Sequence, residues 1–328
     1  MEHLEKIFNV LLRKNFTRKQ FIKNGLSAGI VLGFNAFFSK AASVFAQPDN
    51  SSGRPKKEIK GICDLAVAEG DNPYQITVKA VEAIGGMSRF VAKGGVVLIK
   101  PNIGWDRAPE YAADTNPEVV AALIDLCKQA GAKRVNIFDA ACNEPRRCYA
   151  NSGIQRAARE HGANIFFPSD WNIVKAKFRY KSAMENWPIY REALECDTFI
   201  NVPILKHHGL TRLTLSMKNL MGVCSGNRGL IHSDIGKKLV DLTDFINPDL
   251  TVIDAVRVLT RHGPQGGSLE DVLTLNTVIA GTDPTLCDSY ACTLMREDPL
   301  SISYIQEAVR RGFGTADLSK AKITRVKA

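Results

Sequence analysis

Residues 200–222, INVPILKHHGLTRLTLSMKNLMG, contain several side chains that can ligate, ionise or donate. An apolar run typical of a buried strand leads directly into Lys206, His207 and His208, and a helical pattern then presents Lys218. A lysine at the mouth of a cleft can act as a Schiff-base nucleophile, anchor a phosphate or carboxylate, or tether a cofactor covalently. We therefore expect this segment to form the centre of a functional site.

Lys218 is the stronger candidate of the two lysines, because Asn219 follows it directly and Gly222 comes soon after. Gly222 would let the backbone approach a ligand closely, or would end the helix. The alternative is that Lys218 has a structural role and pairs with a carboxylate such as Asp254 or Asp283.

The two adjacent histidines are weaker candidates than they first appear. Successive side chains of a strand point to opposite faces, so we expect only one of His207 and His208 to face a cleft. As a metal-binding pattern the pair falls far short of an HExxH motif. We keep both as catalytic candidates beside Lys218 and Asp254.

A second group of polar residues follows Gly222. Arg228 and His232 lie in the segment SGNRGLIHSD together with Ser225 and Asn227. Backbone N–H groups near a helix start, combined with an arginine, suit an anion. An ordinary capping loop is the alternative interpretation.

Polar residues also follow several predicted strands. Asn102 comes after VVLIKP, and Asp139 and Asp254 end the runs IFD and TVID. Asp283 precedes Pro284 and is expected to cap the next helix. Ligands of open α/β sheets gather beyond the carboxyl ends of the strands, so we expect a cleft there. The residues expected to bind a cofactor or ligand in it are Asn102, Lys206, Asn219, Arg228, His232 and Asp283.

Eight cysteines occur, none in a CxxC pair, which excludes a zinc ribbon or a thioredoxin-type motif. Cys142 and Cys148 stand out, because both lie in the polar stretch ACNEPRRCYANSG with two arginines between them. Three interpretations stay open for them: a disulfide, a metal or iron–sulfur site shared with Cys196 or Cys224, and a redox-active pair. Three others read as small core residues, namely Cys127, Cys287 and Cys292.

The elements that must position these residues alternate between strand and helix. Strands are expected at residues 95–102, 134–141, 164–170, 197–205, 250–256 and 276–283. Helices are expected at residues 116–133, 152–163, 210–222, 233–245, 284–295 and 301–312. This rhythm predicts an α/β fold built from repeated βα units, with a mainly parallel twisted sheet, helices on both faces, and two lobes that flank a cleft.

The net charge of +9 does not indicate a nucleic-acid partner. Residues 1–46 contain seven Lys/Arg and two Asp/Glu, so more than half of the excess lies in this segment. The body has no basic stripe interleaved with aromatic residues. We therefore expect no nucleic-acid partner, and instead a small anionic ligand or a redox partner.

The N-terminal segment predicts export. A basic stretch ending in TRKQFIK precedes the apolar LSAGIVLGFNAFF and the small residues SKAASVFA, which predicts a signal cleaved after Ala46. An amphipathic N-terminal helix or an uncleaved anchor is the alternative. Residues 47–58 are rich in Pro, Gly and Ser and read as a linker to a domain over residues 59–328. We expect a periplasmic or other extracytoplasmic protein that meets the membrane only through this signal.

Six segments of the chain resemble the domain-of-unknown-function 362 family. They are LIKPNIGW, TNPEVVAALIDLCKQAGAKRV, residues 200–222, PDLTVIDA, HGPQGG and AGTDPTLCDSYACTLM. TRKQFIK is similar to the twin-arginine export motif, with Lys19 in place of the second arginine, which points to the exported branch of that family. The resemblance implies an iron–sulfur cluster in some members, commonly held by an added ferredoxin-like module that is absent from this sequence.

A fainter resemblance links the histidine pair and Lys218 to the nickel-pincer lactate racemases. It implies a lysine that holds a nickel cofactor, with histidines as ligands or as acid and base. Neither resemblance names a reaction. We therefore expect an exported protein that binds a metal-containing or anionic small ligand in the cleft, with a redox or iron–sulfur role, or a non-catalytic protein that binds or presents such a ligand.

Overall fold

The apolar runs rich in valine and isoleucine form the central sheet, in agreement with their composition. The computed structural model describes residues 50–57, 59 and 62–328, and ten strands of this part build one sheet. Its order is β13-β2-β12-β11-β8-β3-β4-β5, with β9 paired to β11 and β10 to β9. The strands are β2 (Leu65–Glu69), β3 (Val96–Pro101), β4 (Arg134–Ile137), β5 (Asn164–Ile165), β8 (Thr198–Val202), β9 (Ile204–His208), β10 (Arg212–Thr214), β11 (Leu250–Leu259), β12 (Val272–Gly281) and β13 (Ile323–Lys327).

Most neighbouring strands run parallel, which confirms the predicted fold class. β12 runs antiparallel to β2 and β11, and β10 runs antiparallel to β9. The other pairs of this sheet are parallel. The carboxyl ends of β3, β4, β8 and β11 therefore lie at one edge, where ligands of α/β sheets gather.

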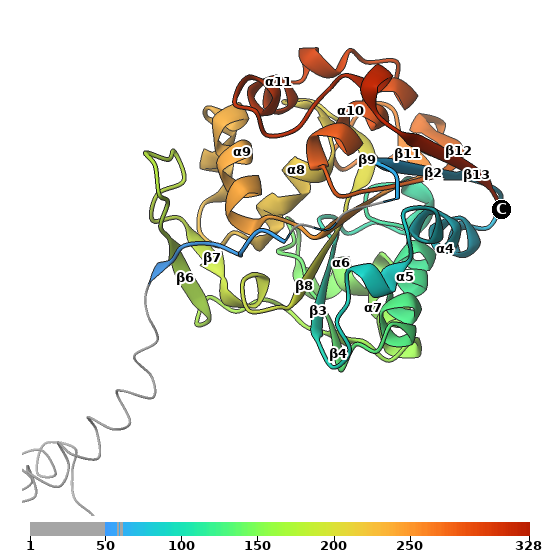
Figure 1. Ribbon diagram of the computed structural model, residues 1–328, viewed down its shortest axis with the longest axis horizontal. Coiled ribbons are helices and arrows are strands. Elements are labelled where there is room, and N and C mark those ends of the chain that lie inside the picture. The colour runs from blue at the N-terminus through green and yellow to red at the C-terminus, as the bar shows by residue number, and fades with distance from the viewer. Residues whose placement is uncertain (1–49, 58, 60–61) are drawn as a thin grey trace, which may run out of the picture. The chain divides into compact units, whose positions relative to one another are not determined.

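Helices cover both faces of the sheet (Figure 1). Within β3, Val97 and Ile99 pack on one side and Leu98 packs on the other, as the two-residue period of a strand requires. The first face carries α4 (Pro73–Ala83), α5 (Pro117–Gln129), α6 (Pro145–Asn151) and α7 (Ile154–Glu160). The second carries α8 (Ser216–Asn219), α9 (Ile235–Ile246), α10 (Pro284–Leu294) and α11 (Ser303–Arg310).

The central segment differs from the prediction in two places. The strand expected over residues 197–205 breaks at Pro203, which has no N–H for a ladder hydrogen bond, and continues as β9. The helix expected over residues 210–222 is instead β10 followed by the single turn α8 and a 3-10 turn at Leu220–Val223. The alternation of Leu and Thr in LTRLTL has the period of a strand, and β10 pairs with the end of β9.

Residues 50–328 form one compact unit, which includes part of the segment predicted as a linker over residues 47–58. β1 (Asn50–Ser51) pairs with β6 (Ile173–Ala176), which pairs in turn with β7 (Pro188–Tyr190). Arg54 is buried and its guanidinium lies 2.6 Å from the carboxylate of Asp249.

The export signal expected over residues 1–46, with cleavage after Ala46, lies outside the residues that the structure describes. Within the described ranges, no helix is both long enough and apolar enough to cross a membrane.

Candidate functional site

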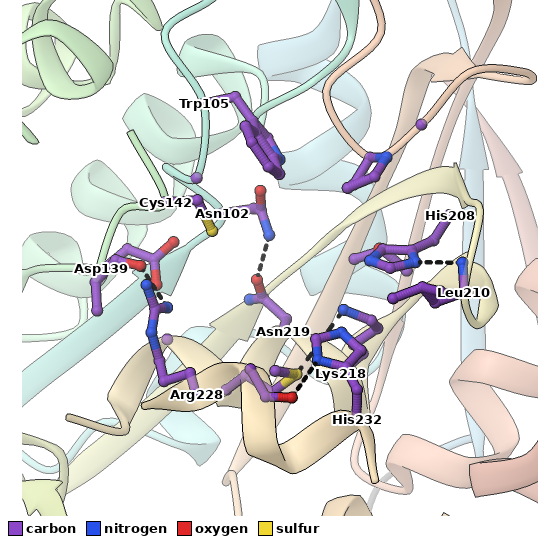
Figure 2. Close-up of a pocket in the computed structure, with 18 of the residues that line it drawn as sticks. Asn102, Trp105, Asp139, Cys142, His208, Leu210, Lys218, Asn219, Arg228 and His232 are labelled. Atoms are coloured by element: carbon purple, nitrogen blue, oxygen red, sulfur yellow. Dashed lines mark hydrogen bonds between the residues drawn. The ribbon is translucent and has the colours of Figure 1, made fainter. Parts of the chain in front are cut away.

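A cavity of about 560 Å³ lies at the carboxyl edge of the sheet, where loops after β3 and β4 meet β9 and α8 (Figure 2). Pockets that hold small molecules measure roughly 300–1,000 Å³, so its size suits a small ligand. Of the thirteen residues predicted for the site, eight line it, namely Asn102, Cys142, Lys206, His208, Lys218, Asn219, Arg228 and His232.

Lys218 faces this cavity, and its ammonium group has no oxygen acceptor among the residues that the structure describes. Its side chain is buried, with 8% of the residue exposed, and its Nζ contacts the sulfur of Met221 at 3.8 Å. No carboxylate of the described chain forms an ion pair with it. Burial, together with the positive charges of Lys206 and Arg228, lowers the pKa of Lys218 to about 8.

The short helix that carries Lys218 is fixed at its first turn by Asp288. The carboxylate of Asp288, from α10, accepts hydrogen bonds from the backbone N–H groups of Ser216 at 2.7 Å and Met217 at 3.2 Å. A single turn of helix is too short to be stable alone, so this cap and the surrounding core hold it in place. Burial raises the pKa of Asp288 to about 7.

Lys206 lies in the same cavity, but its ammonium group donates two hydrogen bonds to the protein. With only 1% of the residue exposed, its Nζ donates to Oδ1 of Asn102 at 3.1 Å and to the carbonyl of Ala113. Burial lowers the pKa of Lys206, and the neighbouring Asp114 opposes that effect. Burial likewise raises the pKa of Asp114, against the effect of Lys206.

Asn219 belongs to a chain of amides beneath the cavity. Asn102 Nδ2 donates to Asn219 Oδ1 at 2.9 Å, and Asn219 Nδ2 donates to Asn201 Oδ1 at 2.9 Å. Asn201 then donates to the carbonyl of Ser216 at 2.8 Å. Lys206, through Asn102, is thus connected to the helix that carries Lys218, so the amides position the two lysines relative to each other.

Two histidines meet at the other side of Lys218, although they are 24 positions apart in the sequence. The rings of His208 and His232 stack with centroids 5.8 Å apart and an interplanar angle of 24°. Burial lowers the pKa of His208 to about 3 and also lowers that of His232, and the charge of Lys218 adds to both effects. Both rings are therefore neutral near pH 7.

His207 points elsewhere. Its Nδ1 accepts a hydrogen bond from the N–H of Gly263 at 3.0 Å, and it does not line the cavity. The two adjacent histidines thus separate as the alternation of strand side chains requires, and His208 is the one at the cavity.

Arg228 lies at the rim and fixes the loop after β4. It donates from its two terminal nitrogens to the carbonyls of Ala140 and Ala141, both at 2.7 Å. It adds positive charge to the cavity, and two of its five N–H groups donate to the protein.

Two of the predicted carboxylates lie outside the cavity, contrary to our expectation. Asp254 is fully buried and accepts hydrogen bonds from the N–H groups of Asn116 at 2.7 Å and Val256 at 3.0 Å. Asp283 caps α10 through Thr285 at 2.8 Å and Leu286 at 3.2 Å. Within the described residues, neither carboxylate forms an ion pair with Lys218.

The cysteines do not gather into a site. All eight are free thiols; Cys142 is exposed and lines the cavity, whereas Cys148, Cys196 and Cys224 are buried. Burial raises the pKa of each of these three, which keeps them protonated. Nowhere in the described ranges do three His, Cys, Asp or Glu side chains lie close enough to hold a metal ion. These residues therefore do not fit the iron–sulfur cluster or the disulfide that we considered.

The sequence analysis missed several residues of the site. Lys100, inside β3, forms a buried ion pair with Asp139 at 2.7 Å, and burial lowers the pKa of Lys100 while Asp139 opposes this. A charged residue in an otherwise apolar strand was the available signal. Thr214 lines the cavity with a buried hydroxyl that has no hydrogen-bond partner in the part of the chain that the structure describes, and the buried Nε2 of His232 is in the same condition.

Comparison with known proteins identifies a family whose model matches this chain. The model of a domain of unknown function, DUF362, matches residues 97–293, which include every residue that lines the cavity. A thylakoid-associated protein from Synechocystis sp. is 29% identical over 244 residues, which are 71% of this chain and 73% of that protein.

Two solved structures share part of the chain trace. The lactate racemase apoprotein from Thermoanaerobacterium thermosaccharolyticum matches 73% of this chain, with a TM-score of 0.46 and 14% identity. A protein from Thermotoga maritima matches 70% of this chain, with a TM-score of 0.39 and 14% identity. The chain spans 58% and 60% of the lengths of these two proteins. The family match covers more than half of the sequence, and this chain therefore belongs to the DUF362 family.

Proposed function

We propose that the cavity binds a small anionic molecule, carrying a carboxylate or a phosphate, and that Lys218 is the residue that contacts its charge. The observation that carries this proposal is the buried ammonium group of Lys218, which faces the cavity without a carboxylate partner. A buried charge without a partner is costly, so a bound anion would supply the interaction that the protein leaves open.

The charges around the cavity support the same conclusion. Lys206 and Arg228 lie on its wall with Lys218, whereas the carboxylate of Asp139 is paired with Lys100. An anion would therefore enter a site of net positive charge that is largely shielded from water.

The unpartnered polar atoms support a ligand that also forms directed hydrogen bonds. The hydroxyl of Thr214 can donate one and accept others, and Nε2 of His232 is buried at the same cavity. Buried polar groups are nearly always hydrogen-bonded in native proteins, so a ligand would complete both.

Isothermal titration calorimetry of the full chain with oxalate, pyruvate and inorganic phosphate tests the proposal and separates carboxylate from phosphate. We expect at least one of these anions to bind, and Lys218→Met to abolish its binding. Lys320→Met is the matched control, because the side chain of Lys320 is 83% exposed and lies outside the cavity. Binding that survives in Lys218→Met, or the absence of binding by all three anions, would overturn the proposal.

We also propose that the protein acts outside the cytoplasm. The basic and apolar composition of residues 1–46 supports this proposal. Cell fractionation with antibody detection tests it, and a full-length product confined to the cytoplasmic fraction would contradict it.

A further inference from the structure

We propose that Lys218 forms an imine with a small anionic carbonyl compound, such as a 2-oxo acid, held in the cavity. The inference rests on the proposed function, because the anionic group of the ligand must first bind there. It goes further in assigning a carbonyl carbon to the ligand and a covalent role to the amine.

The amine of Lys218 is the one in this cavity that is free to react. Lys206 donates to Asn102 and Ala113, and Lys100 is paired with Asp139, so attack by either amine would break buried interactions. Among the described residues, the Nζ of Lys218 has only the weak contact with the sulfur of Met221. Because its pKa is about 8, roughly one tenth of the amine is unprotonated and nucleophilic at pH 7, compared with a far smaller fraction of an ordinary lysine.

The two histidines beside Lys218 carry their protons on different ring nitrogens. Nδ1 of His208 accepts from the N–H of Leu210 at 3.1 Å, so the proton of this neutral ring is on Nε2. Nδ1 of His232 lies 3.2 Å from the carbonyl of Gly229, which can only accept, so the proton is on Nδ1 and the buried Nε2 is a base. One ring thus offers a donor and the other an acceptor at the same cavity (Figure 2).

This arrangement matches the proton transfers that imine formation needs. The nitrogen of Lys218 attacks the carbonyl carbon, and Nε2–H of His208 stabilises the negative charge that develops on the carbonyl oxygen. Nε2 of His232 takes one proton from the attacking nitrogen and delivers it to that oxygen. The second nitrogen proton leaves with the hydroxyl group as water, so that one C=O bond becomes one C=N bond without any oxidant or reductant.

Reductive trapping with pyruvate and sodium borohydride tests the inference on the full chain. An imine reduced in this way adds the mass of pyruvic acid less one oxygen atom to the protein. We expect one such adduct per chain, mapped to the peptide that contains Lys218, with a yield that rises between pH 7 and 9 as the amine loses its proton.

Oxamate, which has the shape and charge of pyruvate but a carbonyl that amines do not attack, is the matched ligand control. Excess oxamate should bind by calorimetry and should suppress the adduct. Lys218→Arg should keep anion binding and lose the adduct, whereas Lys320→Arg should retain both. Peptide mapping of the unaltered protein decides the question even if the buried arginine prevents folding.

The outcomes separate the two proposals. If pyruvate and oxamate bind but no adduct forms on Lys218, the imine is wrong and the anion site stands. An adduct distributed over exposed lysines would equally overturn the imine. If neither compound, nor any other anion tested, binds by calorimetry, the proposed function itself fails.

Discussion

A β-carbon built on Gly222 would lie 1.7 Å from Oδ1 of Asp139 and 2.8 Å from Nζ of Lys100. The turn after Lys218 therefore packs directly against the buried ion pair, and only glycine fits there. We predict that Gly222→Ala lowers the free energy of unfolding by about 1–3 kcal/mol or more, since overpacking forces a buried charge pair to move. Urea unfolding followed by circular dichroism measures this change.

Gly209→Ala is the control for that variant, because its β-carbon would lie 3.8 Å from the nearest atom, the carbonyl oxygen of Gly263. We expect Gly209→Ala to change the free energy of unfolding by less than about 0.5 kcal/mol. Equal unfolding midpoints for the two variants would contradict the packing of Gly222 described above.

Removal of the buried charge at Lys218 should stabilise the protein. The folded-state pKa of about 8 lies below the ordinary 10.5, so between these pH values the unfolded chain binds a proton that the native chain lacks. Stability therefore rises with pH across this window, and the full cost of the charge is present below pH 8. Lys218→Met should be more stable at pH 7 by about 1–3 kcal/mol, and the difference should vanish towards pH 10.5.

Chemical denaturation at several pH values between 7 and 10.5 measures this difference. Lys320→Met, at an exposed position, should unfold as the unaltered protein does throughout. A Lys218→Met protein that is less stable at pH 7 would show that the ammonium group forms stronger interactions in the native protein than the structure indicates.

His208 should make the protein sensitive to acid. Its folded-state pKa of about 3 lies below the ordinary 6.5, so as the pH falls below 6.5 the unfolded chain gains a proton that the native chain does not. His208→Asn should remove this loss, and its oxygen can still accept the N–H of Leu210. We expect the variant to lose about 1–3 kcal/mol less stability than the unaltered protein between pH 6.5 and 4. If the free energies of unfolding of the two proteins fell equally between pH 6.5 and 4, His208 would not be a buried neutral histidine.

Asp254 should matter for stability and not for ligand binding. Asp254→Asn leaves at least one of the two backbone N–H groups, those of Asn116 and Val256, without a carboxylate acceptor. We expect a loss of about 1–3 kcal/mol in the free energy of unfolding, with unchanged affinity for any anion that binds. A large loss of affinity in a folded Asp254→Asn protein would show that Asp254 contributes to ligand binding.

Cys142 should be the cysteine that reacts in the native protein, because the other seven are buried. Brief treatment with iodoacetamide followed by peptide mass mapping should locate the label on Cys142, and a bound anion should slow the reaction because this thiol lines the cavity. Denaturation without a reductant should expose eight titratable thiols. A smaller number would reveal a disulfide.

The sequence predicted the sheet and the edge at which the cavity lies, because both follow from local patterns. Valine and isoleucine runs mark the strands, and the sequence Asn116-Pro117 begins α5 as expected, with the side chain of Asn116 accepting from Glu118. The antiparallel direction of β12 was not predictable, since direction depends on which strand it joins and not on its own composition.

The candidate site was predicted only in part, because its geometry depends on contacts between segments that are far apart in the sequence. Lys218 and His208 were recognisable because they lie within one segment, but the stacking of His208 on His232 depends on how a distant loop folds back. Asp254 shows the opposite error. Asp254 lies in the middle of β11 and not at its end, and its carboxylate accepts a hydrogen bond from the backbone N–H of Asn116, 138 positions away.

The amides beneath the cavity form a hydrogen-bonded chain with a fixed direction. Each of Asn102, Asn219 and Asn201 donates from nitrogen to the next acceptor, and Lys206, which can only donate, supplies the first hydrogen bond. No single amide can rotate by half a turn without placing two donors or two acceptors face to face. The cavity therefore has a rigid base, and a ligand that fits poorly would have to be accommodated by the exposed side chain of Leu210, which also lines the cavity. Selectivity among small anions should accordingly be set at the base, and tolerance for different substituents should be set at the opening.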